Sequence, residues 1–301
     1  MKQRLHSFDA MRAIAMFLGV VLHASIAYKA NPVFGWPRDF SYNNVVFDYL
    51  YHFIHLFRME LFFAIAGFFT HFLILKIGPG EFAAHRFKRI VIPFVLSTIV
   101  LVPLSMVPFR YFDYMSQHGT ESLHLGVVLS LTIDSYKQWN GLLHLWFLYD
   151  LIYFYTFTLI IYRFRNIGYI KFLWLKISAF VGSNLVNHKL IVVLGILLFI
   201  NTLYFSSIDV PVNTGIRINL ALLIYYYTFF AFGIILHFLV DDLWRLKRHG
   251  LLNVSIGLLL SIVSYAFYIG LNLESHFIKF INAFATVFFC YWFFGGFSDC
   301  F

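Results

Sequence analysis

Long apolar runs separated by short polar segments dominate this chain of 301 residues. Eight runs have the length of a membrane-spanning helix, about 20 residues, and they lack the period-2 alternation of a membrane β-strand. They cover residues 9–28, 57–77, 89–107, 142–162, 189–206, 217–240, 251–271 and 277–297. The pattern predicts an all-α, polytopic transmembrane helical bundle of about eight spans, forming a single domain over residues 1–301.

Two connections differ from the short polar ones. Residues 45–56 are aromatic and amphipathic, so they either extend the second span or lie along the membrane interface. Residues 108–141 carry mixed charge and are predicted to form the longest loop.

Composition places the chain outside the soluble class. It is 61% hydrophobic and 12% charged, whereas soluble domains have about 45–50% apolar and about 25% charged residues. The net charge of +8 does not indicate nucleic acid, because no basic, aromatic-studded stretch is present. Two cysteines exclude a disulfide framework and a thiolate metal site. His52 and His55 lack an evident third ligand, so no metal is expected.

The basic residues predict which side of the membrane each loop faces. With a cytoplasmic N-terminus, 14 of the 22 Lys and Arg residues fall in inside loops and six fall outside. Inside loops of membrane proteins are enriched in Lys and Arg, so the N-terminus is predicted to be cytoplasmic. The other two, Arg12 and Arg58, lie within predicted spans. An uncompensated charge there costs about 3 kcal/mol or more.

The first span carries two polar groups on one face. Arg12 and His23 are eleven positions apart, which is about three helical turns and about 16 Å along the axis. Arg12 then lies near the cytoplasmic edge and His23 in the outer half of the membrane. One interpretation is a snorkelling arginine and a packing histidine; the other is a functional pair.

Glu60 in the second span is predicted at a depth similar to that of His23, about 24 Å against about 21 Å from the inner edge by helix rise. A carboxylate that orients an imidazole makes a general base, so we expect Glu60 to pair with His23. The alternative is an Arg58–Glu60 interaction at the end of the helix, although residues two apart do not share a helix face.

Arg86 and Arg89 open the third span, and their spacing places them on one face, where they could bind a phosphate or pyrophosphate. The alternative, which the sequence by itself favours, is ordinary positive-inside charge. His144 and Trp146 lie at the outer mouth of the fourth span, and Asp150 lies deeper and needs a partner. Gly67 is predicted to allow close helix packing.

These groups together suggest one substrate. Cations at the cytoplasmic mouth lie about 20 Å from a base in the outer half. Acyl-CoA has a matching shape, with phosphates at one end and a thioester at the other. A base there would take a proton from an acceptor hydroxyl, which then attacks the thioester. We expect acyl-CoA as co-substrate and no bound cofactor.

Four ordered motifs carry a resemblance to a known family. They are the R-x10-H pair Arg12 and His23, FIHLFRMELFFAIAGFF (Phe53–Phe69), the R-x-x-R pair Arg86 and Arg89, and HLWFL (His144–Leu148). In these motifs the sequence resembles the acyltransferase-3 family of integral-membrane acyltransferases.

The resemblance implies a multi-pass enzyme of the bacterial inner membrane, which moves an acyl group from a cytoplasmic donor to an extracytoplasmic glycan hydroxyl. For the glucan-modifying branch it implies succinyl transfer from succinyl-CoA to periplasmic glucan, with glucan synthase machinery as a candidate partner. By matched position, Arg12 and His23 are essential and Arg86 and Arg89 serve the donor. Arg58, His144 and Trp146 are candidates for contacts to the acyl group or acceptor, Arg58 for a succinyl carboxylate.

The sequence also departs from the family. Ala66 replaces a small polar residue, and Glu60 stands where the glucan branch often has proline. Members usually continue through about two more C-terminal helices, which we expect this chain to lack. Two other functions therefore stay open: a transporter or lipid-handling protein with a charged path through the membrane, and a truncated, inactive relative.

Overall fold

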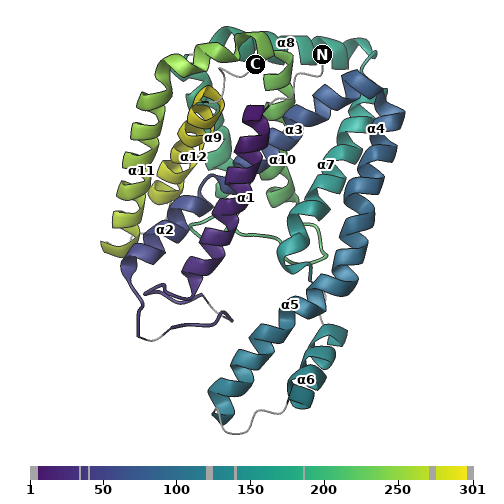
Figure 1. The fold of residues 1–301 in the computed structure, drawn as a ribbon. Helices are drawn as coiled ribbons and strands as arrows, with labels where there is room; N and C mark the ends of the chain where they lie inside the picture. Colours follow the sequence, from purple (N-terminus) through teal and green to yellow (C-terminus); the bar gives the residue numbers. More distant parts are fainter. Residues whose placement is uncertain are drawn as a thin grey trace.

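The computed structural model describes residues 6–33, 35–39, 41–119, 125–138, 141–185, 187–270 and 276–296. These residues form a helical bundle (Figure 1), and their only bridges are two isolated ones, Lys29–Asn44 and Gly141–Gly215. The elements are α1 (His6–Ile26), α2 (Val45–His55), α3 (Arg58–Ile77), α4 (Pro79–Arg86), η1 (Phe87–Val91), α5 (Ile92–His118), α6 (Leu125–Gln138), η3 (Leu143–Leu145), α7 (Trp146–Arg163), α8 (Gly168–Asn184), α9 (His188–Thr202), α10 (Leu220–Phe238), η4 (Val240–His249), α11 (Gly250–Gly270) and α12 (His276–Gly296).

Each predicted span coincides with a helix. Six described segments are long and apolar enough to cross a membrane: Val45–Ile77, Pro79–Gln117, Leu143–Arg163, Leu220–Phe238, Val240–Ile269 and His276–Gly296. The first and fifth predicted spans are shorter apolar helices, Ala10–Ile26 and Lys189–Thr202. The all-α membrane fold class is therefore confirmed, while the count of eight spans and the cytoplasmic N-terminus stay predictions.

One predicted connection is wrong, and another contains a helix for which no prediction was made. Residues 108–141 are mainly helical, because α5 continues through Pro103 and Pro108 to His118 and is followed by α6. Prolines inside a helix usually kink or end it, and Figure 1 shows the distal part of α5 projecting from the bundle with α6 beside it. The connection after α7 contains α8, which lies across the end of the bundle where α1 begins (Figure 1).

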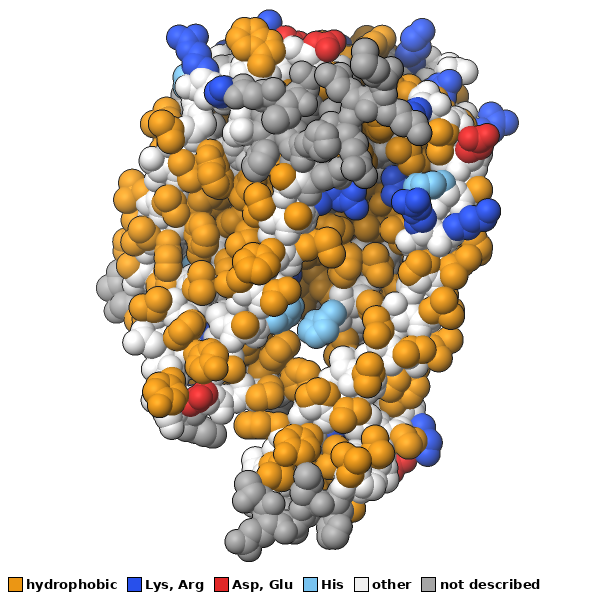
Figure 2. Space-filling view, in the orientation of Figure 1, with side chains coloured by type: hydrophobic (Ala, Val, Ile, Leu, Met, Phe, Trp, Pro, Cys, Tyr) orange, Lys and Arg blue, Asp and Glu red, His pale blue; other side chains and the backbone are white. Residues whose placement is uncertain are grey.

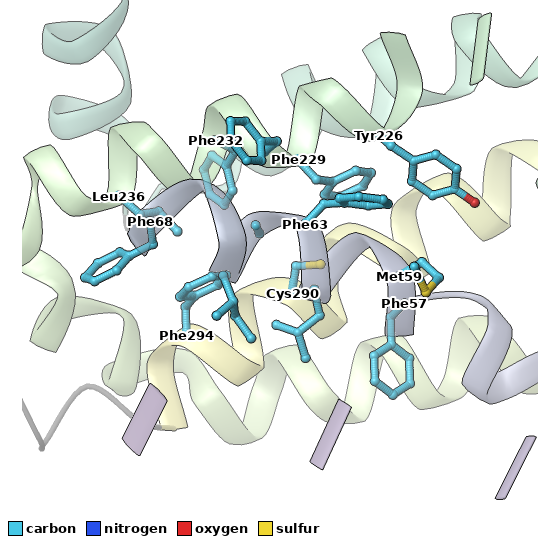
Figure 3. Packing of buried hydrophobic residues seen from close by; sticks show 14 of the residues in the cluster. Phe57, Met59, Phe63, Phe68, Tyr226, Phe229, Phe232, Leu236, Cys290 and Phe294 are labelled. Carbon is cyan, nitrogen blue, oxygen red and sulfur yellow. The ribbon is translucent and has the colours of Figure 1, made fainter. Parts of the chain in front are cut away.

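The α3–α10 pair forms the centre of the bundle. Figure 3 shows aromatic side chains from both helices packed together with Cys290 and Phe294 of α12. Phe63, Phe68 and Phe230 are fully buried in this core. Because aromatic side chains bury large areas and pack edge to face, this cluster fixes how the helices are oriented around their own axes.

Two glycines allow α3 and α10 to touch through their backbones. A Cβ atom on Gly67 would overlap the carbonyl oxygen of Phe230, and one on Gly233 would overlap the carbonyl oxygen of Ala64. Small residues at such positions let membrane helices approach closely. The prediction that Gly67 is a close-packing glycine is confirmed.

Replacing Gly67 with alanine should therefore push α3 and α10 apart. We expect Gly67→Ala to reduce stability by about 1–3 kcal/mol, the usual cost of overpacking, measured by thermal unfolding of the protein in detergent. Gly80→Ala is the matched control, because a Cβ there meets no atom within 4 Å and alanine favours helix. Equal unfolding temperatures for the two variants would contradict the assigned contact.

Candidate functional site

His23 lies in the last turn of α1 and faces two aromatic rings. Its imidazole stacks on Trp36, with ring centroids 5.4 Å apart and an angle of 8° between planes, and it meets His144 edge-on at 4.8 Å. The Nδ1 atom of His23 is buried and has no hydrogen-bond partner in the described part of the chain. A buried, unpaired ring nitrogen can accept a proton from a bound hydroxyl.

A strained turn brings His144 to this position. Leu143 has φ = 44°, the only positive φ of a non-glycine residue among those described. This left-handed conformation costs a side chain with a Cβ about 1–3 kcal/mol. The turn is held by the Gly141–Gly215 bridge and by the Leu142 amide, which donates to the carbonyl of Thr214. The segment after α9 thus fixes the backbone that carries His144.

Arg58 connects α3 to α1 beside the histidines. Its guanidinium occupies the space that a Cβ on Gly19 would need, one turn before His23. It lies near enough to His23, His144 and Glu60 to interact with them electrostatically. Its Nε atom is buried without a hydrogen-bond partner among the described residues. A cation here can bind an anionic group that comes next to His23.

The sequence predicts that Glu60 pairs with His23, but in the structure each of these two side chains contacts other residues. Glu60 is buried, and its Oε1 accepts a hydrogen bond of 3.1 Å from the hydroxyl of Tyr225 on α10, whereas the His23 ring faces Trp36 and His144. Helix rise predicts similar depths for the two groups, but it does not predict the directions in which they point around their helices. The electrostatic Arg58–Glu60 interaction, our alternative, is present. A catalytic role for Glu60 stays a prediction.

Three arginines gather around the end of α1 opposite His23. The guanidinium of Arg12 lies 5.7 Å from the ring centre of Phe69, and that of Arg86 lies 5.1 Å from the ring centres of both Phe82 and Tyr155. Arg86 interacts electrostatically with Arg12 and with Arg89. Figure 2 shows basic side chains bordering the upper part of a hollow that contains histidine side chains lower down.

The helix is irregular where this arginine cluster forms. Residues Phe87–Val91 form a π-helical segment between α4 and α5, and Arg89 lies within it. Single π-helical turns occur frequently at functional sites, because the wider turn redirects side chains. Guanidinium groups that lie close together can bind the oxygens of one phosphate group through paired hydrogen bonds. The arginine cluster (Arg12, Arg86, Arg89) therefore has the chemistry of a phosphate-binding site.

Comparison with known proteins identifies the family. A family model described as an acyltransferase domain, that of the acyltransferase-3 family, matches residues 5–300. The chain belongs to the acyltransferase-3 family. It is 31% identical over 168 residues to glucans biosynthesis protein C of Escherichia coli strain SMS-3-5, and 30% identical to the protein of the same name from strain K12. Each alignment covers 54% of this chain and 40% of the relative, so the chain spans less than half of these relatives. No solved structure is significantly similar to the chain.

Two polar or aromatic residues that the sequence analysis singled out in this acyltransferase-3 chain, Trp146 and Asp150, are both buried. Trp146 is buried in the core, with its ring 5.3 Å from Tyr226 and 6.1 Å from Phe63. This placement favours packing over a contact with the acceptor. Asp150 is also buried and interacts electrostatically with Tyr226 and Tyr153.

A second polar network was not predicted. His52 and Asp209 are joined by a 3.0 Å hydrogen bond, and His55 Nε2 lies 3.0 Å from the carbonyl oxygen of Val210. Burial would raise the pKa of Asp209, but His52, His55 and Lys29 outweigh it and lower the pKa to about 2. The network binds the segment after α9 to α2. No local sequence pattern points to Asp209, which is 157 positions from His52.

The hydrogen bond between Tyr225 and Glu60 should matter for stability. Tyr225→Phe removes a donor from a buried carboxyl group, and an unsatisfied buried group costs about 1–3 kcal/mol. We expect a clear decrease in unfolding temperature in detergent. Tyr169→Phe, at a tyrosine that is 73% exposed, should leave it unchanged. If Tyr225→Phe also had no effect, the assigned bond would not contribute.

Proposed function

We propose that the chain is a multi-pass acyltransferase of the bacterial inner membrane, which moves an acyl group from cytoplasmic acyl-CoA to a hydroxyl of an envelope glycan. The observation that carries the proposal is the division of polar groups along α1. Arg12 joins the arginine cluster at one end, and His23 meets His144 at the other. About 16 Å of helix rise separates the two positions, a distance that an extended pantetheine arm can span.

The arginine cluster would hold the phosphates of the donor. Guanidinium groups bind phosphate oxygens through paired hydrogen bonds. Phe82 and Tyr155, which flank Arg86, would keep its guanidinium in place. With the nucleotide bound there, the pantetheine arm would run along α1 and place the thioester near His23.

The transfer step follows from the unpaired imidazole nitrogen. The acceptor hydroxyl gives its proton to His23, and its oxygen attacks the thioester carbonyl carbon to form a tetrahedral intermediate. The carbon–sulfur bond then breaks as the carbonyl re-forms, and the protonated His23 returns the proton to the departing sulfur. The products are an oxygen ester and free thiol. Arg58, beside His23, would stabilise the developing oxyanion or bind a carboxylate of the acyl group.

The name of the relatives supports a glucan acceptor, and the position of Arg58 supports a succinyl group. The relatives are named for glucan biosynthesis. A succinyl group carries a carboxylate, and Arg58 offers a cation next to His23. Glucan synthase machinery is the partner that this acceptor suggests.

Replacing His23 should strongly reduce the rate of transfer while the protein stays folded. We expect His23→Ala to lower the rate of acyl transfer from acyl-CoA to glucan by about 10²-fold or more, the usual contribution of a general base. The measurement is label incorporation by purified protein. His276→Ala, which changes an exposed histidine at the start of α12, is the matched control and should keep full activity. Unchanged transfer in His23→Ala would refute the mechanism.

Replacing Arg58 should raise the KM for succinyl-CoA more than the KM for acetyl-CoA. If its guanidinium binds the succinyl carboxylate, Arg58→Gln should raise the KM for succinyl-CoA about tenfold more than that for acetyl-CoA, because only the former loses a charge pair of about 1.4 kcal/mol. Steady-state kinetics with both donors measures this ratio. Equal losses with both donors would reject this contact while leaving the role of His23 unaffected.

A further inference from the structure

An open groove lies on the face formed by α9 and α10, apart from the residues of the proposed mechanism. Its volume is about 960 Å³, and it extends from the two helices to residues 213–219. Its walls differ from end to end. Leu197, Ile200 and Ile224 form an apolar part, and Asn201, Asn213 and Arg217 form a polar part.

The apolar part belongs to helices predicted to lie in the membrane. Leu197, Ile200 and Ile224 are 52%, 50% and 58% exposed. Exposed aliphatic side chains on such helices contact acyl chains rather than water. The apolar part therefore suits the acyl chain of an amphiphile more than a soluble sugar.

The polar part offers a cation and an acceptor without partners. The Arg217 guanidinium makes no hydrogen bond or ion pair with any described residue, and the Asn213 amide donates to the Arg217 carbonyl, which shapes the rim. Asn201 Oδ1 is buried without a hydrogen-bond donor in the described part of the chain. The positive end of the α10 dipole lies beside them, since Asn219 caps that helix.

We propose that this groove binds a phospholipid with an anionic, hydroxyl-bearing head group, chemically a phosphatidylglycerol. The acyl chain lies against α9 and α10, and the phosphate pairs with Arg217. A head-group hydroxyl donates to Asn201 Oδ1, the acceptor that otherwise has no partner. A phosphatidylcholine also has a phosphate that can pair with Arg217, but its quaternary ammonium cancels the negative charge of the head group. It has no hydroxyl to donate to Asn201 Oδ1, so it satisfies the two requirements less well than a phosphatidylglycerol.

The groove is connected to the turn that carries His144. The same segment that forms its polar rim provides the Thr214 carbonyl to the Leu142 amide and the Ile216 carbonyl to the Tyr149 hydroxyl, at 3.2 Å. A lipid that orders residues 213–217 therefore also orders the backbone next to His144. The bound lipid is a structural ligand on the side of the predicted outer leaflet.

Lipid binding by the full chain tests the proposal without any measurement of transfer. Purified protein in detergent is titrated with phosphatidylglycerol or phosphatidylcholine of identical acyl chains, and bound lipid is counted by native mass spectrometry. We expect phosphatidylglycerol to bind more tightly and Arg217→Gln to weaken its binding about tenfold. Arg110→Gln is the matched control, because Arg110 is also on the predicted outer side but pairs with Asp113 at 3.1 Å.

Three results would overturn the proposal. Equal binding of the two lipids would remove the role of the head group, and equal effects of Arg217→Gln and Arg110→Gln would remove the role of this groove. The third result is competition: if inorganic phosphate or soluble glucan displaces phosphatidylglycerol from the native protein but not from Arg217→Gln, the groove binds a different ligand. Asn201→Leu should reduce the preference for phosphatidylglycerol over an anionic lipid whose head group is methylated and has no hydroxyl. An unchanged preference would exclude the contact between the head-group hydroxyl and Asn201.

Discussion

The backbone contact between α3 and α10 at Gly67 and Gly233 is the constraint on which the rest of the structure depends. It brings two helices together closely enough for Glu60 and Tyr225 to form a buried hydrogen bond. The aromatic core around this pair then fixes the direction of α3, whose first residue, Arg58, extends to α1. In a membrane, where apolar surfaces gain little from contact with one another, such close packing and internal hydrogen bonds hold helices together.

From this centre the polar groups separate toward two ends of α1. The arginine cluster lies at one end, and the rings of His23, His144 and Trp36 lie at the other. Each group is held by elements outside α1: a π-helical turn redirects the arginine-bearing helix, and a strained turn tied to the segment after α9 positions His144. Charged groups inside a membrane are costly and usually serve a function, and the chain belongs to a family of acyltransferases.

The positions of the helices follow largely from the periodicity of the sequence. The contacts between side chains on different helices follow much less from it. Eight apolar runs predicted eight helices, and eleven-residue spacing placed Arg12 and His23 on one helix, because both depend only on local geometry. The partner of Glu60 depended on how α3 is rotated about its axis, which the core determines and spacing does not. Trp36 and Asp209 lie in segments without periodicity, and Asp209 is 157 positions from its partner His52. Residues 108–141 appeared to be a loop because they carry mixed charge and no apolar run of spanning length, yet α5 continues to His118 and α6 follows it.

Transfer across a sealed membrane tests the central claim most directly. In proteoliposomes that contain labelled acyl-CoA, with glucan outside, the proposal predicts label on the external glucan, because it places the donor at the arginine cluster on one side of the membrane and the acceptor at His23 on the other. With donor and glucan both outside, little label should be transferred. Each molecule needs the donor on one face and glucan on the other, and in this arrangement both substrates reach the same face whichever way the molecule is oriented. Equal labelling in the two arrangements would contradict a path that runs along α1 from one side of the membrane to the other.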